Sequence, residues 1–286
     1  MRALIPLVLL LTFATSNAEN HVNTLKRIAE TGEFRIGYVP DAPPLSFRDS
    51  ENNVTGYSID LCRRIASATR DELGLEQIEI TFTPLVTMED RLSAVENGDV
   101  DIECGATTVT LSRRERVDFT LMTFITGSAV LSRKSSPINK IDDLDGAKIA
   151  VSRGTTTEDV MRRAIEINSF NIKLKLISSH DEGIKLLNAG KVSGYASDRA
   201  MLIGQVFRAA NASNEYALTR NALSFEPYAL MIPRGDTDFR LVADKALASL
   251  YRGAGIRRLY HNWFGRYGEP LSPIVEAMYE FQAVGE

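Results

Sequence analysis

The stretch that decides the fold is residues 101–119, Asp-Ile-Glu-Cys-Gly-Ala-Thr-Thr-Val-Thr-Leu-Ser-Arg-Arg-Glu-Arg-Val-Asp-Phe. The apolar start at 100–104 predicts a short strand that ends at Gly105, and a loop of small residues follows. Ser112 is then expected to cap a short helix, because its hydroxyl can accept a free N–H of the first turn. Arg113 lies in that first turn, a few residues after the loop.

This strand, loop and helix start together predict a binding site for a planar carboxylate. Free backbone N–H groups, two threonine hydroxyls and the guanidinium of Arg113 would converge on one small volume. The arginine fork can donate two parallel charge-assisted hydrogen bonds, and the loop can supply the remaining donors. The alternative is an ordinary strand-to-helix turn that carries a surface arginine.

The same stretch resembles the signature of the periplasmic solute-binding proteins that feed polar amino acids to ABC importers. In that family the Gly and Thr loop, together with an Arg five residues later, holds the α-carboxylate of the ligand. The resemblance covers the whole mature chain, and the wording Glu-Cys-Gly-x-Thr-Thr at 103–108 is closest to the glutamate/aspartate binders. It implies that Arg113, Thr108 and the backbone of Ala106 hold that carboxylate.

Length and composition are those of a globular protein. The chain has 286 residues, of which 44% are hydrophobic and 24% charged, so disorder is not expected. The formal net charge is −4, with both signs spread along the chain. No basic footprint for nucleic acid is present, and we expect no nucleic-acid partner.

The N-terminus has the pattern of a secretory signal peptide. Met1-Arg2 gives the positive start, 3–15 the apolar run, and Ser16-Asn17-Ala18 a cleavage site of small residues. The apolar run is shorter than the roughly 20 residues that cross a bilayer. We therefore expect a soluble periplasmic protein that begins near Glu19.

Two cysteines, Cys62 and Cys104, remain after export. An oxidising compartment permits a disulfide between them. Two buried free thiols that pack as small hydrophobic groups are the alternative. The sequence leaves both possibilities open, because it does not place the two Cα atoms.

Strands alternate with helices along the chain, which predicts an α/β protein with largely parallel sheets. The resemblance implies a two-lobed, type II periplasmic-binding-protein fold with two hinge strands. The expected divisions are a signal peptide at 1–18, a first lobe at 19–126, a second lobe at 127–224, and a return to the first lobe at 225–286. The expected strands are 34–39, 79–83, 100–104, 125–133, 148–152, 172–177, 192–197 and 226–233. Residues 40–44 are expected to form a loop, and 211–221 a polar excursion.

A second strand, loop and helix start occurs at 148–158. Thr155 and Glu158 have the spacing of a capping box at the start of a helix. A well-capped helix without a ligand is the alternative interpretation. The resemblance implies that this loop holds the same carboxylate through Thr156, with Thr155 beside it.

Asp198 follows the strand expected at 192–197 and opens the helix expected at 199–208. An acidic residue at that position is a common helix cap. The resemblance implies that this carboxylate binds the α-ammonium group of the ligand, and we expect it to fulfil both roles.

The side-chain end of the pocket is assigned by resemblance to the glutamate/aspartate binders. It implies that Arg91 and His180 hold the side-chain carboxylate, whereas a solvated arginine and a surface histidine are the alternatives. Val39 and Met88 stand where those binders have an Arg and a Ser, which favours glutamine as a second candidate ligand. Asp41 and Ser46 are further candidates for the wall of the site.

Two other functions remain open from the sequence. A dehydratase-like enzyme of the cyclohexadienyl dehydratase type would need an acid or base in the cleft, for which Glu226 and His180 are the candidates. A sensor module would need a membrane helix after Phe264. The catalytic patterns of Ser/His/Asp, Cys/His and metal sites are absent from the sequence, so we expect a monomeric binder with no cofactor and no metal. Its partner would be the membrane subunits of an ABC importer.

Overall fold

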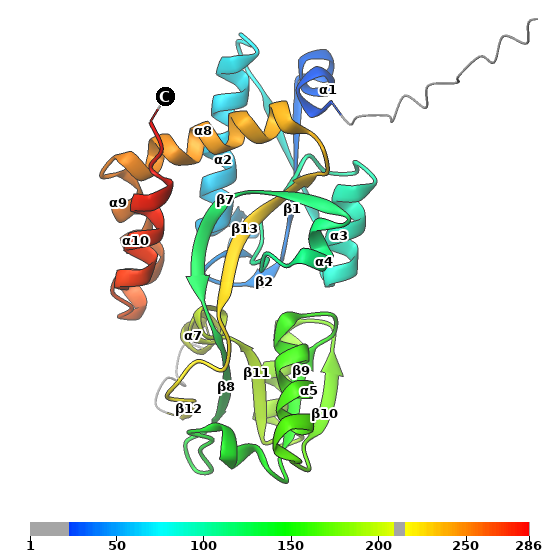
Figure 1. The fold of residues 1–286 in the computed structure, drawn as a ribbon, viewed down its shortest axis with the longest axis vertical. Helices are drawn as coiled ribbons and strands as arrows, with labels where there is room; N and C mark the ends of the chain where they lie inside the picture. Colours follow the sequence, from blue (N-terminus) through cyan, green and yellow to red (C-terminus); the bar gives the residue numbers. More distant parts are fainter. Residues whose placement is uncertain (1–22, 209–214, 286) are drawn as a thin grey trace, which may run out of the picture.

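The computed structural model describes residues 23–208 and 215–285, so the predicted signal peptide lies outside the described residues. The chain forms two lobes, each built on one five-stranded sheet (Figure 1). The sheet of the first lobe has the order β5-β1-β6-β13-β7. Its strands are β1 (Glu33–Tyr38), β5 (Glu79–Pro84), β6 (Ile102–Glu103), β7 (Val117–Thr126) and β13 (Glu226–Pro233). The predicted α/β class is confirmed.

The sheet of the second lobe has the order β10-β9-β11-β8-β12. Its strands are β8 (Ser128–Arg133), β9 (Lys148–Ser152), β10 (Lys173–Ile177), β11 (Gly194–Asp198) and β12 (Tyr216–Leu218). Both sheets are mixed, with parallel strands on one side and antiparallel strands on the other. In the first sheet the antiparallel strand is β13, which pairs with β6 and β7, and in the second it is β8, which pairs with β11 and β12.

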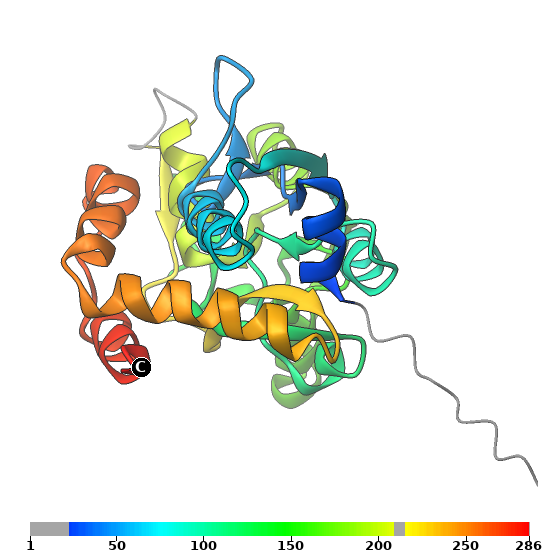
Figure 2. The ribbon, with the colours of Figure 1, turned by 90° about the horizontal axis from the view of Figure 1, so that it is seen from above.

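Helices cover the faces of both sheets. In the first lobe α8 (Thr237–Arg252) packs against α2 (Tyr57–Glu72), as the view from above shows (Figure 2). The other helices of that lobe are α1 (Thr24–Thr31), α3 (Met88–Glu96), α4 (Leu111–Arg114), α9 (Gly255–Phe264) and α10 (Pro273–Gln282). The helices of the second lobe are α5 (Thr156–Asn168), α6 (His180–Asn188) and α7 (Arg199–Arg208). Two short 3-10 helices, η1 (Ile141–Leu144) and η2 (Gly265–Tyr267), complete the described elements.

Two predicted loops contain short strands. The Pro-rich segment includes β2 (Asp41–Ala42), which pairs with β3 (Ser46–Arg48), and β3 pairs in turn with β4 (Val54–Thr55). The loop prediction for 40–44 was wrong there, since Asp41 and Ala42 leave their backbone groups free to pair even though prolines flank them. The described part of the polar excursion likewise contains β12, the edge strand of the second sheet.

The chain passes between the lobes at Gly127, where β7 ends and β8 begins, and again before β13. A side chain at Gly127 would place its Cβ 2.3 Å from the backbone oxygen of Ser224, so only glycine permits the two crossings to lie this close. Glu226 begins β13 directly after this contact and pairs with Thr126. The strands that cross between the lobes therefore lie side by side (Figure 1).

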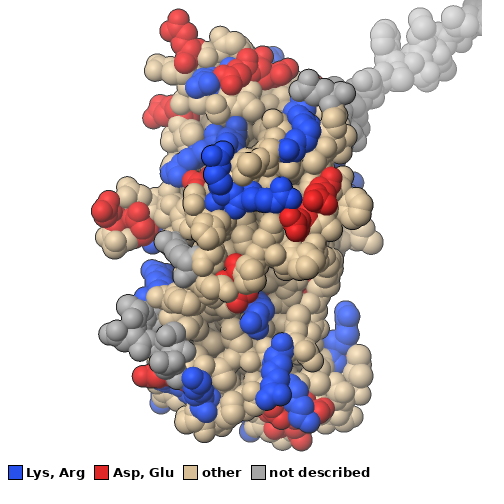
Figure 3. All heavy atoms as spheres, turned by 90° about the vertical axis from the view of Figure 1, so that its left-hand side faces the viewer, with Lys and Arg blue, Asp and Glu red and all other residues tan. Residues whose placement is uncertain are grey.

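The C-terminal tail packs on the first lobe, as predicted. The side chain of Gln282 accepts a hydrogen bond from the Met122 N–H at 2.7 Å and donates one to the Met122 carbonyl at 3.0 Å. These bonds satisfy the outer edge of β7, an edge strand of the sheet. The predicted core role of the C-terminal aromatic residues is also confirmed, since buried Phe264 stacks on Phe124 with the ring centroids 4.6 Å apart. On the face drawn in Figure 3, basic and acidic side chains are interspersed.

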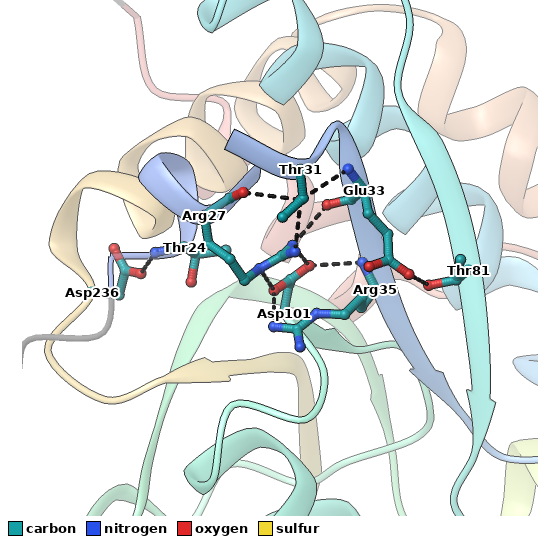
Figure 4. A network of polar contacts seen from close by, with 8 residues as sticks. All are labelled: Thr24, Arg27, Thr31, Glu33, Arg35, Thr81, Asp101 and Asp236. Carbon is teal, nitrogen blue, oxygen red and sulfur yellow. Dashed lines mark hydrogen bonds and ion pairs between the residues drawn. The ribbon is translucent and has the colours of Figure 1, made fainter. Parts of the chain in front are cut away.

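A buried ion-pair cluster fixes the start of the stretch 101–119. Asp101 lies between two arginines (Figure 4) and accepts hydrogen bonds from Arg27 Nε at 3.1 Å and from Arg35 Nη2 at 2.9 Å. It also accepts the Arg35 backbone N–H at 2.7 Å. Because a buried carboxylate must be paired to be tolerated, this cluster ties α1 to the sheet and fixes where β6 begins.

A disulfide fixes the other end of β6. Cys62 in α2 and Cys104, both fully buried, are bonded, with their Cα atoms 6.3 Å apart. Of the two possibilities that the sequence left open, the structure therefore has the bridge. It joins α2 to the residue that immediately precedes the loop at 105–108.

We predict that the unfolded, unreduced mature protein contains no free thiol. Replacing both Cys62 and Cys104 by Ser should lower the free energy of unfolding by about 4 kcal/mol, because the sequence separation of 42 residues gives a long closed loop. Urea denaturation of the double variant and of the oxidised parent measures this loss. The reduced parent, which also lacks the bridge, is the control. Two free thiols in the parent would contradict the bridge.

Candidate ligand-binding cleft

A cavity of about 580 Å³ lies between the two lobes. Residues of both lobes line it, and they include all eight residues for which the sequence analysis expects a ligand-binding role. These are Arg91, Ala106, Thr108, Arg113, Thr155, Thr156, His180 and Asp198. The folded chain therefore brings together side chains that are as far apart as 91 and 198 in the sequence.

Arg113 reaches the cavity from α4, and this helix is capped differently from the prediction. The cap is Thr110, whose hydroxyl oxygen accepts the Arg113 N–H at 3.2 Å. Ser112, the predicted cap, already lies inside the helix. Thr110 replaces it because its backbone is extended, which is the conformation that a cap residue needs.

The guanidinium of Arg113 lies between the lobes. It is 8% exposed, donates from Nη1 to the Thr108 carbonyl at 2.7 Å, and reaches the Gly154 carbonyl from Nη2 at 3.4 Å. Burial first, and then the nearby charge of Arg91, lower the pKa of Arg113 to about 10. Arg113 therefore remains a cation at neutral pH and is positioned by backbone oxygens from both sides of the cleft.

The loop at 105–108 presents backbone donors next to this cation. In the described part of the chain, the N–H groups of Ala106 and Thr108 have no hydrogen-bond partner. A side chain at Gly105 would place its Cβ 2.2 Å from Glu103 Oε1, so the loop can pass over Glu103 only as glycine. Free N–H groups beside an arginine form a set of donors that suits a carboxylate.

Thr155 caps α5 in the second lobe, with its hydroxyl oxygen accepting the Glu158 N–H at 3.2 Å. The predicted capping box is incomplete, since Glu158 accepts the Gly154 N–H at 2.8 Å instead of the N–H of Thr155. Thr156, the first helical residue, faces the first lobe, and its hydroxyl lies 3.5 Å from that of Thr108. The two loops therefore meet across the cleft.

Asp198 ends β11 and lies 5% exposed in the cleft. Among the described residues its carboxylate accepts hydrogen bonds only from hydroxyls: Thr157 at 3.0 Å, Ser128 at 3.3 Å, and Tyr228. The predicted second role as a cap of α7 is therefore wrong, and the Ala200 N–H instead points to the Thr126 hydroxyl. Burial and the nearby charge of Glu226 raise the pKa of Asp198 to about 6.

Glu226 lies directly behind the cleft and is 2% exposed. Its Oε2 accepts hydrogen bonds from the hydroxyls of Thr108 and Thr156, both at 2.7 Å. Its Oε1 accepts from Ser224 at 2.5 Å and from Ser128 at 3.4 Å. The Ser128 hydroxyl therefore lies within reach of both Glu226 and Asp198.

Arg91 in α3 lines the far end of the cavity but already has partners. Its Nε donates to Glu103 at 2.8 Å, and its Nη2 donates to Thr107, which in turn donates to Glu103 at 2.8 Å. Within the described residues, its Nη1 has no hydrogen-bond partner. Arg91 can therefore offer a ligand one edge of a guanidinium whose charge Glu103 largely balances.

His180 begins α6 next to Arg91, with its Nδ1 hydrogen-bonded to the Tyr195 hydroxyl. Burial lowers the pKa of His180, which opposes a positive charge at neutral pH. When Tyr195 donates to Nδ1, a neutral imidazole carries its proton on Nε2 and can donate it. Val39 and Met88 also line this end of the cavity and contribute only apolar surface.

Asp41 and Ser46, the two further candidates for the wall of the site, do not line the cavity. Asp41 accepts the Asp181 N–H at 3.1 Å with one carboxylate oxygen, and its backbone carbonyl accepts from Gln205 at 2.5 Å. Ser46 accepts the Val39 N–H at 3.0 Å. Both residues therefore fix the shape of the segment around Val39, and Asp41 adds a contact between the lobes.

Sequence reasoning missed the hydroxyls that hold Asp198, which belong to Ser128, Thr157 and Tyr228. It considered Glu226 only as an acid or base for the enzyme alternative. One signal was available: Glu226 and Tyr228 are two residues apart on one strand, so their side chains lie on the same face of the sheet, the face of the cleft.

Residues 23–208 and 215–285 contain no group of three or more His, Cys, Asp or Glu side chains that could hold a metal ion. No helix within those ranges is long and apolar enough to cross a membrane.

Comparison with known proteins agrees with this geometry. The L-glutamate/L-aspartate-binding protein of Pseudomonas aeruginosa is 32% identical over 257 residues, 90% of this chain and 83% of that protein. The glutamate/aspartate import solute-binding protein of Salmonella typhimurium is 26% identical over 89% of this chain and 83% of its own length. An ancestral amino acid-binding protein described as a precursor of cyclohexadienyl dehydratase is 25% identical, with a TM-score of 0.72 over 84% of this chain and 99% of its own.

The family match extends across most of the chain. Residues 34–266, which contain both sheets and all the predicted site residues, match the family described as bacterial extracellular solute-binding proteins, family 3. The resemblance read from the stretch 101–119 is thereby confirmed. This chain belongs to the bacterial extracellular solute-binding proteins of family 3.

Proposed function

We propose that this protein captures a polar amino acid in the periplasm and delivers it to the membrane subunits of an ABC importer by hinge closure. Glutamate or aspartate is the best candidate ligand, and glutamine is the next. The observation that carries the proposal is that a buried cation, Arg113, and a buried carboxylate, Asp198, line one cavity from opposite lobes. An amino acid carries the two complementary charges on adjacent groups.

The α-carboxylate would lie on the first lobe. Arg113, the free N–H groups of Ala106 and Thr108, and the hydroxyls of Thr108 and Thr156 provide its donors. Thr155 shapes this end by capping α5. Hydrogen bonds to charged groups contribute about 1.5–3 kcal/mol each, so this end supplies much of the affinity.

The α-ammonium group would lie on Asp198, in the second lobe. Because each lobe holds one end of the ligand dipole, the closed state binds the ligand better than the open state does. That difference in affinity is what shifts a hinged protein towards closure. The moving parts would be the first lobe at 19–126 and 225–286 and the second lobe at 127–224, with hinges at Gly127 and before Glu226.

The ligand side chain would extend towards Arg91 and His180. The free Nη1 of Arg91 and the Nε2 proton of His180 can donate to a carboxylate or to an amide oxygen. Two relatives whose names include glutamate and aspartate support an acidic ligand. Val39, Met88 and the pairing of Arg91 with Glu103 reduce the positive charge at this end, which keeps glutamine as the second candidate.

A transport role without catalysis is the function we propose. The dehydratase-related solved structure is itself titled an amino acid-binding protein. A thermal-shift screen of the twenty amino acids tests the proposal, since stabilisation rises with ligand excess over the dissociation constant. Glutamate, aspartate or glutamine should give the largest shift, with the ligand recovered unchanged. No shift with any amino acid would contradict the binding function, and a product formed from the bound compound would favour the enzyme alternative.

Arg113→Ala should weaken binding of the amino acid found in this screen by several kcal/mol, on the order of a hundredfold or more in dissociation constant. The loss arises because Arg113 is the buried cation beside the free N–H groups of Ala106 and Thr108, whereas Arg153, which also lines the cavity, is exposed. Isothermal titration calorimetry measures it. Arg114→Ala, an exposed arginine on the same helix, is the matched control and should bind like the parent. Equal affinity of the Arg113 variant and the parent would refute the assignment.

Asp198→Asn should abolish binding and yet stabilise the ligand-free protein at neutral pH. The folded-state pKa of Asp198, about 6, lies above its ordinary value of 3.8, so the folded state retains a proton that the unfolded state releases. Stability from this group is therefore lost as pH rises from about 4 to 6, and the Asn variant escapes that loss, which amounts to about 3 kcal/mol.

Urea denaturation at pH 4 and pH 7 measures this difference, which should be present at pH 7 and small at pH 4. Asp142→Asn, an exposed carboxylate in the second lobe, is the control and should change stability little at either pH. An Asp198 variant that is less stable than the parent at pH 7 would contradict the prediction.

A further inference from the structure

The two threonine hydroxyls of the proposed carboxylate site donate their hydrogens to a carboxylate of the protein itself. Thr108 from the first lobe and Thr156 from the second both donate to the same oxygen of Glu226, each at 2.7 Å. A hydroxyl has one hydrogen to donate. With these hydrogens directed to Glu226, both threonines present only lone pairs to the cavity.

A ligand carboxylate accepts hydrogen bonds and cannot donate them. Lone pairs of Thr108 and Thr156 would repel it, although the same hydroxyls lie beside Arg113 at the carboxylate end of the cavity. An ionised Glu226 therefore competes with the ligand for the hydrogens of both threonines.

No cation is hydrogen-bonded to Glu226 in the described part of the chain. Arg113 on α4 donates to backbone carbonyls, and Arg91 on α3 donates to Glu103 of β6 and to Thr107. Glu226 thus depends on hydroxyl donors alone while it is 2% exposed. Such a buried charge is costly unless it is paired or neutralised.

The nearest carboxylate adds to this cost. Asp198 on β11 reaches the Ser128 hydroxyl at 3.3 Å, and Glu226 reaches the same hydroxyl at 3.4 Å. Both carboxylates accept hydrogen bonds from several hydroxyls, Asp198 from Tyr228 on β13 among others, so these bonds do not decide between them. In the proposed complex the ligand ammonium group favours the ionised form of Asp198, and the ligand carboxylate beside Thr108 and Thr156 disfavours the ionised form of Glu226. Two like charges in one buried network favour the uptake of a proton by one member of the pair.

We propose that Glu226 is a positioning residue of the ligand site, which takes up a proton when the cleft closes on an amino acid. This inference rests on the function proposed above. The proton comes from solvent and forms an O–H bond on Glu226, and no bond of the ligand changes. The protonated Glu226 donates to one threonine, whose own hydrogen then turns to the ligand carboxylate. Asp198 stays ionised and receives the ligand ammonium group.

The amide of Gln matches this protonated state. In Glu226→Gln, the amide NH₂ can donate to both Thr108 and Thr156, which frees both hydroxyl hydrogens for the ligand. The amide oxygen can accept from Ser224 and Ser128 in place of Oε1. The variant should therefore bind the amino acid without needing a proton.

Calorimetry of the amino acid with the largest thermal shift, in buffers of different ionisation enthalpy near pH 7.5, counts the protons. The parent should take up close to one proton per ligand, and its dissociation constant should rise with pH by up to about tenfold per unit. Glu226→Gln should take up almost none and bind about tenfold or more tighter than the parent at pH 7.5, with little dependence on pH, because it does not have to gain the proton that the parent needs.

Glu33→Gln is the matched control. Glu33 also accepts a threonine hydroxyl, that of Thr81 at 2.8 Å, but at the opposite edge of the first sheet (Figure 4). This variant should keep the proton uptake of the parent. Proton uptake that is unchanged in Glu226→Gln, or loss of binding in a folded Glu226→Gln protein, would overturn the inference.

Calorimetry of the parent protein alone also tests the role of Glu226. Binding of an amino acid by the parent without proton uptake refutes the role of Glu226 and leaves the proposed function standing. Failure of the parent to bind any amino acid refutes both.

Discussion

One buried carboxylate oxygen of Glu226 accepts hydrogen bonds from both lobes. It accepts Thr108 from one lobe and Thr156 from the other, at equal distances of 2.7 Å. Around it, Arg113 and Asp198 offer opposite charges to the same cavity. The proposed closure would bring unlike charges and shared hydroxyls into a buried space, where electrostatic interactions are stronger than in bulk solvent.

For closure to report that a ligand is bound, each lobe must move as a rigid unit. The first lobe has strong internal ties close to the site: the disulfide from Cys62 to Cys104 and the cluster around Asp101 hold the two ends of β6. Gln282 covers the free edge of β7. In the proposed hinge mechanism, conformational change would be concentrated beside Gly127, where the chain crosses between the lobes.

The sequence predicted much of this arrangement, because its signals are local. Strands that end in small-residue loops, and a helix that begins with Thr155 as its cap, follow from the residues themselves. What could not be read was pairing at a distance. The Cys62–Cys104 bridge, the β12 edge strand and the hydroxyls around Asp198 depend on which strands become neighbours, and local patterns do not specify that. Ser112 was mistaken for the cap because two hydroxyls, at 110 and 112, compete for one helix start.

The buried charges of the cleft bear on whether the proposed site favours an acidic ligand or glutamine. Of the buried charged groups around the proposed ligand contacts, Arg113 and Arg91 are the cations and Glu103, Asp198 and Glu226 the anions, so this buried set carries excess negative charge when all of them are ionised. The side chain of glutamate would add more, and the neutral imidazole of His180 offers a hydrogen bond but no compensating charge. A proton on Glu226 removes one negative charge from this set, so the charge on an acidic side chain replaces one that has been neutralised. In this way the same proton that turns the threonine hydroxyls towards the ligand lowers the electrostatic cost of an acidic ligand relative to glutamine.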